Sequence, residues 1–184
     1  MGALTALLGL RRRDRQERTG FRLYGAAVAA ARAPYLYAGL GVPDTLDGRF
    51  EMVGLHAFLL IDRLRGESPP GPDLAQAVFD AMFSDMDQTL REIGVGDLTV
   101  GKRVRQMWEA FHGRAAAYGA ALADANDAAL TAALARNVWR GAAPPADSAE
   151  RLARLVRSQQ DCLAGQTLAA LAAGEVRFQP CESP

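Results

Sequence analysis

The sequence predicts an all-α, single-domain helical bundle of about six helices, with a Gly/Pro-rich loop after the first helix. Apolar residues recur at spacings of three and four along most of the chain, whereas apolar–polar alternation with a period of two never persists. The 184 residues are 49% apolar and 23% charged, enough for one core. We therefore expect one helical domain over residues 16–175, preceded by a flexible apolar and basic segment, 1–15, and followed by an extended tail, 176–184.

The first half of the domain contains two expected helices and a loop. The first helix is expected over about 16–33, because the residue before Pro34 avoids the α region. Glycines, a proline and short acidic residues in 35–49 favour an ordered loop. The next helix, over about 47–64, is apolar nearly all round, which is typical of a helix at the centre of a bundle.

Two long amphipathic helices follow, joined by a glycine-rich elbow. The first is expected over about 73–93 and ends at Gly94-Val95-Gly96. Asp97 or Thr99 is expected to cap the second helix, whose apolar stripe continues to Leu122.

The last part of the chain predicts two further helices. A short helix over about 127–140 precedes the linker Pro144-Pro145. Asp147 and Glu150 have the spacing of a capping box, which predicts a final helix to about Ala172.

Charge and cysteine content exclude several classes of protein. The 21 basic and 21 acidic residues balance, so no global positive field exists to bind nucleic acid. No run of 18 apolar residues predicts a membrane-spanning helix. The two cysteines have neither redox nor zinc-site spacing, and their scarcity suits a reducing compartment. A cytoplasmic location is therefore expected.

The N-terminus has an apolar stretch, 1–10, followed by arginines, which reverses the order of a secretory signal. An apolar segment beside arginines can rest on an anionic membrane surface. The alternative is a frayed terminus followed by a solvated charged turn. The membrane-contact hypothesis rests on Leu7, Leu8, Arg11, Arg12 and Arg13.

Acidic residues crowd the helix before the elbow, and a solvated face is the favoured interpretation. Asp87 precedes Arg91 by four residues, which predicts an ion pair within the helix. Lys102 and Arg103 open the next helix, where the helix dipole disfavours positive charge. Either an acidic or lipid partner contacts these cations, or they pair within the chain with residues such as Asp97.

No catalytic, metal or cofactor site is predicted. Glu109 and His112 form one Glu-x-x-His unit, whereas di-iron bundles need two. His56 lies on the very apolar helix, where a local hydrogen bond is expected rather than metal ligation. The alternative from another class is a haem- or metal-binding bundle protein or enzyme built around His56, His112, Glu109 and Asp80.

Three segments carry a resemblance to a known family: GVPDTLDGRFEMVGLHAFLLIDRLRG (41–66), FDAMFSDMDQTLREIGVGDLTVGKRVRQM (79–107) and EAFHGRAAAY (109–118). They resemble the ubiquinol–cytochrome c chaperone family, strongly over about 21–122. This family is the bacterial counterpart of the mitochondrial protein that chaperones newly made cytochrome b. The resemblance implies a non-enzymatic assembly chaperone for ubiquinol–cytochrome c reductase (complex III), acting on the cytoplasmic face of the inner membrane.

Mitochondrial members carry a transit peptide and a longer N-terminus, which this sequence lacks, so the chain is similar to bacterial members. They also work with a small second subunit and at the ribosome, which makes both possible partners here. A generic membrane-surface adaptor is a further alternative.

A chaperone for a helical membrane protein must offer an apolar surface with a polar rim, and methionines adapt well to such a surface. The charged residues of the predicted partner-binding set are expected along one exposed surface. Its methionines either line a groove or fill the core. The set is Asp44, Arg49, Glu51, Met82, Asp85, Met86, Arg91, Lys102 and Arg103.

Overall fold

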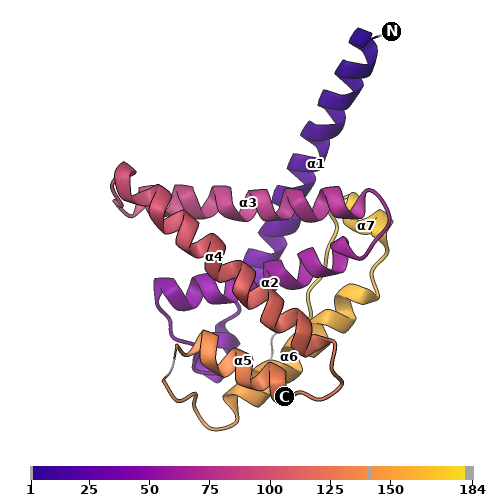
Figure 1. The fold of residues 1–184 in the computed structure, drawn as a ribbon. Helices are drawn as coiled ribbons and strands as arrows, with labels where there is room; N and C mark the ends of the chain where they lie inside the picture. The colour runs from indigo at the N-terminus through magenta and orange to yellow at the C-terminus, as the bar shows by residue number, and fades with distance from the viewer. Residues whose placement is uncertain (1, 141, 181–184) are drawn as a thin grey trace.

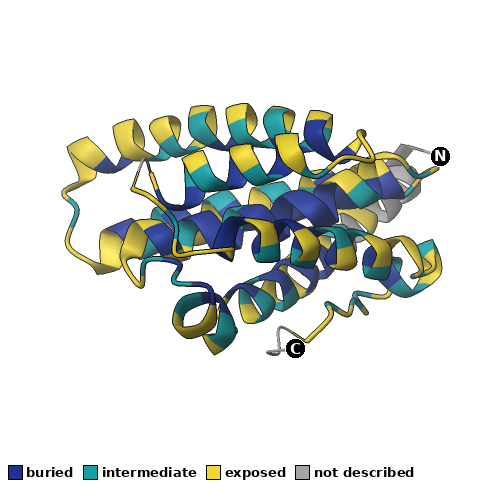
Figure 2. Ribbon diagram, turned by 90° about the horizontal axis from the view of Figure 1, so that it is seen from below, coloured by how far each residue is buried: buried dark blue, intermediate teal, exposed yellow. Residues whose placement is uncertain are grey.

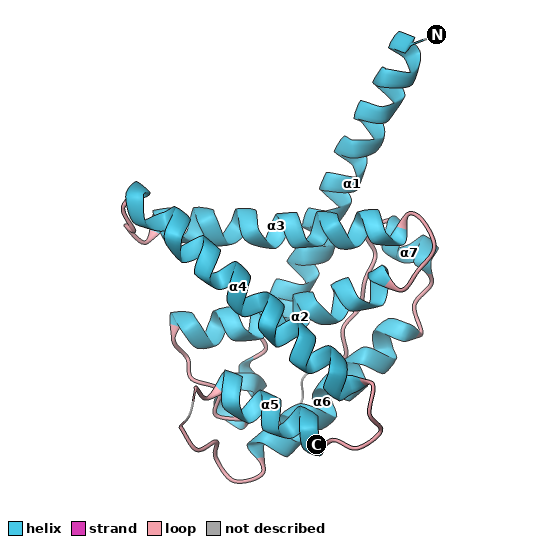
Figure 3. Ribbon diagram, viewed as in Figure 1, coloured by secondary structure: helices cyan, strands magenta, loops and turns pink. Residues whose placement is uncertain are grey.

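The computed structural model describes the backbone of residues 2–140 and 142–180, and within these ranges the side chains from residue 12 onward. These residues form one compact domain with seven α-helices, one π-helical turn and no strand, which confirms the all-α prediction (Figure 3). The elements are α1 (Gly2–Ala31), η1 (Tyr35–Gly39), α2 (Leu46–Arg65), α3 (Gly71–Glu92), α4 (Asp97–Leu122), α5 (Ala128–Val138), α6 (Ser148–Ala164) and α7 (Leu168–Ala172).

Helix α2 lies at the centre of the bundle, as its all-round apolar pattern predicts. It packs against α1, α3 and α6 and also contacts α4 and α5. Met52, Leu60 and Leu64 on this helix are fully buried. Figure 2 shows buried residues on the sides of the helices that face one another and exposed residues on the outward sides. The side chains of α2 therefore form the middle of the core.

Helices α1 and α3 cross at very short range. A Cβ atom added to Gly20 in α1 would lie 2.6 Å from the backbone carbonyl of Ala77 in α3, a distance that no side chain tolerates. Glycine is therefore required at this crossing. This close contact fixes the position of α3, and α3 residues line a space between α2 and α4.

The first helix is longer than the sequence predicts. It begins at Gly2 rather than near Gln16, and its N-terminal end projects beyond the rest of the bundle (Figure 1). Arg12 contributes to this difference, because its Nη2 lies 3.2 Å from the Asp73 carboxylate of α3 and ties this part of α1 to the bundle.

The membrane-contact hypothesis is not tested by these contacts. The side chains of Leu7, Leu8 and Arg11 lie outside the described residues. Arg13 is exposed, and Arg12 points to Asp73. In the described part of the chain, no helix is both long enough and apolar enough to cross a bilayer.

The segment between α1 and α2 is well packed. It contains the π-helical turn η1, and the side chains of Leu36, Leu40 and Val42 are buried. The indole nitrogen of Trp139 donates a hydrogen bond to the carbonyl of Gly41 at 3.0 Å. The segment is thus ordered, as its composition predicts, and the turn places the start of α2 beside the end of α5.

Two predicted helix caps are wrong. Helix α4 has Gly96 as its N-cap with no side-chain cap, because Asp97 instead pairs with Arg91, Nη1–Oδ1 2.5 Å. Asp147 caps nothing with its side chain, because its backbone is left-handed with φ of 60°, outside the extended conformation that a capping box needs.

Threonines supply the caps that the sequence analysis missed. Thr45 Oγ1 accepts a hydrogen bond from the backbone N–H of Gly48 at 3.1 Å and starts α2. Thr167 Oγ1 accepts from Ala170 N–H at 3.2 Å and starts α7. The predicted last helix is therefore two helices, because α6 ends at Ala164 and a new cap begins α7.

Candidate functional site

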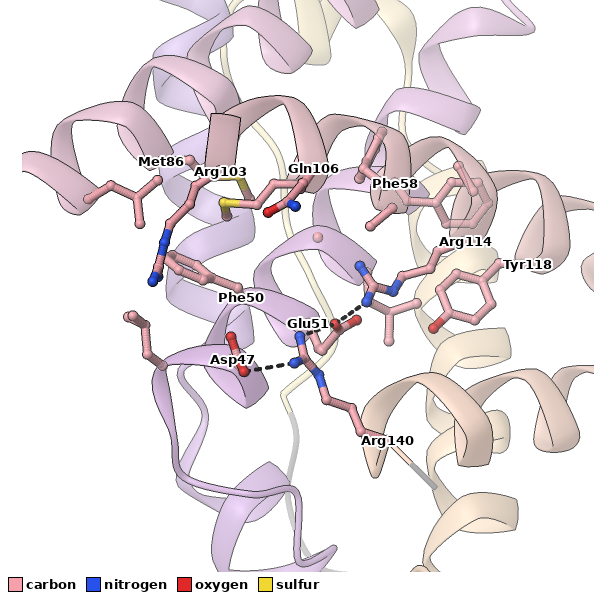
Figure 4. Close-up of a pocket in the computed structure, with 18 residues that line it drawn as sticks. Asp47, Phe50, Glu51, Phe58, Met86, Arg103, Gln106, Arg114, Tyr118 and Arg140 are labelled. Atoms are coloured by element: carbon pink, nitrogen blue, oxygen red, sulfur yellow. Dashed lines mark hydrogen bonds and ion pairs between the residues drawn. The ribbon is translucent and has the colours of Figure 1, made fainter. Parts of the chain in front are cut away.

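A groove of about 320 Å³ lies between α2, the C-terminal part of α3, and α4 (Figure 4). Most of its wall is apolar, and an ion-pair network of Asp47, Glu51, Arg114 and Arg140 lies at one end. The apolar lining includes Phe50, Leu55, Phe58, Met86, Leu90, Met107, Ala110, Phe111, Ala115 and Tyr118. This is the kind of site between bundle helices in which ligands and partner segments bind.

The groove exists because α4 crosses α2 with small residues at the crossing. Helix α4 runs diagonally across α2 from the elbow that joins it to α3 (Figure 1). A Cβ atom added to Gly54 of α2 would still be 3.9 Å from the Phe111 ring of α4, an ordinary contact distance. Ala110 and Ala115 continue this run of small side chains on α4. These small side chains leave the space between the two helices unfilled at the groove.

An ion-pair network occupies the polar end of the groove. Arg114 Nη2 lies 2.5 Å from Glu51 Oε1, and Arg140 Nη2 lies 3.4 Å from the same oxygen. Arg140 Nη1 also binds Asp47 Oδ2 at 2.7 Å, as Figure 4 shows. The carboxylates of Glu51 and Asp47 therefore link α2 to α4 and to the chain after α5.

Glu51 is nearly inaccessible to solvent, with its side chain 4% exposed. Burial raises the pKa of its carboxyl, and the Arg114 and Arg140 guanidinium groups act in the opposite direction. The prediction that Glu51 is part of an exposed charged surface is wrong. A buried carboxylate on the central helix needs cationic partners, and Arg114 of α4 and Arg140, which follows α5, provide them.

Three other residues of the predicted set, Met82, Met86 and Asp85, make contacts within the bundle. Met82 is fully buried, so it fills the core and cannot contact a partner. Met86 is 4% exposed but lines the groove. Asp85 is exposed and accepts a hydrogen bond from the Tyr24 hydroxyl of α1 at 2.6 Å. Burial, assisted by Asp85, raises the pKa of Tyr24.

The remaining predicted residues are exposed. Asp44 and Arg49 form an ion pair at 2.6 Å before and at the start of α2. Arg91 binds Asp87 at 2.6 Å, which confirms the predicted helix ion pair. Lys102 and Arg103 are exposed and form no ion pair with any residue that the structure describes. The groove therefore brings together only Glu51, Met86 and Arg103 of the predicted partner-binding set.

Arg114, Arg140, Phe50 and Tyr118 are groove residues that the sequence analysis missed. The one available indication was Glu51, a carboxylate on a helix that is apolar nearly all round. Nothing in the spacing identifies Arg114 and Arg140 as its partners, because they are far away in sequence. Burial raises the pKa of the Tyr118 hydroxyl to about 12, so this residue is neutral at physiological pH.

The Glu-x-x-His unit has only local contacts. Glu109 pairs with Arg105 at 3.0 Å, and His112 Nδ1 lies 2.9 Å from the carbonyl of Trp108. Among the described residues, no three His, Cys, Asp or Glu side chains lie close enough together to hold a metal ion. The geometry gives no support to the alternative built around His56, His112, Glu109 and Asp80.

His56 makes the local hydrogen bond that the sequence predicts. Its Nδ1 lies 2.8 Å from the carbonyl oxygen of Met52, so Nδ1 carries the proton. Its Nε2 is buried without a partner among the described atoms, and the ring packs edge-on against Phe178 at 5.6 Å. Burial lowers the pKa of His56, because a charged ring would be desolvated.

His56 should make the stability of the protein depend on pH. Its pKa is near 6.5 in the unfolded chain and lower in the fold, so between these values the unfolded chain binds more protons. The contribution of a neutral His56 is present above the unfolded pKa and is lost as pH falls toward the folded pKa. We expect the free energy of unfolding, measured with urea, to decrease from about pH 7.5 to about pH 5.5.

Two variants isolate this contribution. His56→Met removes the titrating group from the core and should flatten the pH dependence. His112→Gln removes an exposed histidine and should retain it. If His56→Met and the wild type lost the same stability over this pH range, other groups would cause the change.

The fold and the groove define an all-helical protein with an apolar cleft, an ion-pair network around the buried Glu51 carboxylate at one end, and the exposed cation Arg103 at its rim. A family model described as ubiquinol-cytochrome C chaperone matches residues 38–178. The chain belongs to this family, as the resemblance in its sequence predicts.

Known proteins agree with this assignment. The chain is similar to ubiquinol-cytochrome-c reductase complex assembly factor 1 of Xenopus laevis, 27% identical over 86% of this chain and 80% of that protein. It is 26% identical to the Mus musculus factor of the same name, of which it spans 54%. The crystal structure of the Cbp3 homolog from Brucella abortus is 40% identical, with a TM-score of 0.83, over 96% of this chain and 97% of that one.

Proposed function

We propose that this protein is a non-enzymatic assembly chaperone that binds newly made cytochrome b and promotes assembly of ubiquinol–cytochrome c reductase. Membership of the chaperone family and similarity to the vertebrate assembly factors support the complex III part of this proposal. The groove between α2, α3 and α4 is the observation that supports a direct contact with the client.

The chemistry of the groove suits a hydrophobic client. A helix of a membrane protein exposes apolar side chains before it finds its partners, and these aggregate in water. Phe50, Met86 and Met107 offer a matching apolar wall, and methionine adapts to side chains of different shapes. Helix-in-groove binding uses such walls, with anchors spaced at about three and four residues. The exposed cation Arg103 lies at the rim, where charge affects the rate of capture and release.

The proposed place of action is the cytoplasmic face of the inner membrane, where the client is inserted. The exposed side chain of Arg13 and the projecting end of α1 support a peripheral contact with anionic lipid. In this account the bundle lies at the surface of the bilayer and does not span it. The contact with lipid raises the local concentration of chaperone near its client.

Deleting the gene tests the proposal. Membranes of the deletion strain should lose most of the b-type signal in reduced-minus-oxidised spectra, together with ubiquinol–cytochrome c reductase activity. A plasmid copy of the wild-type gene should restore both. Normal cytochrome b and normal reductase activity in the deletion strain would contradict the proposal.

A further inference from the structure

Positive charge exceeds negative charge in the lining of the groove. Two carboxylates, Asp47 and Glu51, line the groove together with three guanidinium groups, Arg103, Arg114 and Arg140. Arg114 and Arg140 share a single oxygen of Glu51, and Arg140 also binds Asp47. Arg103 has no ion-pair partner in the part of the chain that the structure describes. One cation is thus left without a counter-charge beside a hydrophobic space.

The remainder of the groove is apolar and narrow. Arg103 and Tyr118 both line it, and on an α-helix these positions are roughly 22 Å apart at 1.5 Å per residue. The volume of about 320 Å³ is near the lower end of the range for small-ligand sites. A slender apolar chain fits such a space better than a broad polycyclic group does.

We infer that the groove binds an amphipathic anion with a single apolar chain, of which a fatty-acid carboxylate is the simplest case. The chain lies against Phe50, Met86 and Met107, and the anionic head lies beside Arg103 at the rim. Guanidinium groups bind carboxylates with strong charge-assisted hydrogen bonds. Binding of a small amphiphile is distinct from the proposed assembly function, because it requires only the groove and not the client.

Methionine methyl groups report binding at defined places. Met86 and Met107 line the groove, whereas Met52 and Met82 are fully buried outside its lining. With ¹³C-methyl methionine in the full chain, dodecanoate below its micelle concentration should shift the methyl signals of Met86 and Met107 and leave those of Met52 and Met82 in place. Dodecyltrimethylammonium, which has the same chain and a positive head, should shift neither pair.

Three variants complete the test. Arg103→Gln should weaken dodecanoate binding about fivefold, as expected for the loss of one charge-assisted contact at a solvated rim. Ala110→Trp, which places an indole in the groove, should abolish the shifts. Ala116→Trp, on the same helix at an exposed position outside the lining, should preserve them.

The inference is overturned if dodecanoate shifts no groove methyl, if the cationic amphiphile binds equally well, or if these four methionine signals shift together as in general unfolding by detergent. Dodecanoate binding is measured without the client or any other protein. Dodecanoate can therefore fail to bind even if complex III assembly depends on the protein, and it can bind even if assembly does not depend on the protein. The two proposals can thus fail separately.

Discussion

Cells whose only copy of the gene encodes Ala110→Trp should contain about tenfold less assembled ubiquinol–cytochrome c reductase than wild-type cells. Ala110 lies in the groove wall on α4, and an indole at this position fills the space in which we propose that the client's side chains bind. Loss of one buried hydrophobic anchor commonly costs more than about 1.4 kcal/mol, which is a tenfold change in affinity. Reductase activity and the b-type spectrum of isolated membranes measure the effect.

Ala116→Trp is the matched control, because it introduces the same side chain on the same helix at an exposed position away from the groove. It should support normal levels of the complex. Both variants should keep the helical circular dichroism and the melting behaviour of the wild type, since the indole at position 110 enters open space. Equal reductase levels in the two strains would mean that the client binds elsewhere on the protein.

Arg114→Met should lower the free energy of unfolding by about 2–4 kcal/mol, the largest stability effect expected at the groove. The substitution removes the cation at 2.5 Å from the buried Glu51 carboxylate and leaves only Arg140, at 3.4 Å. A buried charge that loses its close partner keeps its desolvation cost. The expected loss is smaller than for a fully orphaned charge because Arg140 remains. Urea unfolding followed by circular dichroism measures it.

The double variant Glu51→Met with Arg114→Met should recover most of the lost stability, because two apolar side chains can replace a buried ion pair at little cost. Arg105→Met breaks an exposed pair on the same helix, with Glu109, and should change stability by less than about 0.5 kcal/mol. If Arg105→Met were as damaging as Arg114→Met, the burial of Glu51 would not be the cause.

The sequence predicts the helices well because apolar periodicity is a local property. The central position of α2 follows directly from its all-round apolar pattern, and the elbow at residues 94–96 follows from its glycines. Helix ends are predicted less well, because a cap depends on backbone conformation. Asp147 has the right residue type for a cap, but its left-handed backbone excludes the hydrogen bond.

The groove could be predicted only in part. Met86 and Arg103 are among the predicted residues and do line it, since both belong to the amphipathic pair around the elbow. Glu51 is buried although the sequence predicts that it is exposed, because the charge of a residue alone does not determine its exposure. Its partners Arg114 and Arg140 lie on other segments, and periodicity within one helix contains no information about contacts between helices. Tertiary packing therefore determines which residues meet at the polar end of the groove.

The central claim is that newly made cytochrome b contacts this groove, and crosslinking in cells tests it most directly. A photo-reactive amino acid at Gln106, an exposed residue of the groove lining, should form an adduct with cytochrome b labelled in a short pulse. The same amino acid at Arg154, an exposed residue of α6 outside the lining, should not. Absence of the adduct at Gln106, or equal adducts at both positions, would contradict the account.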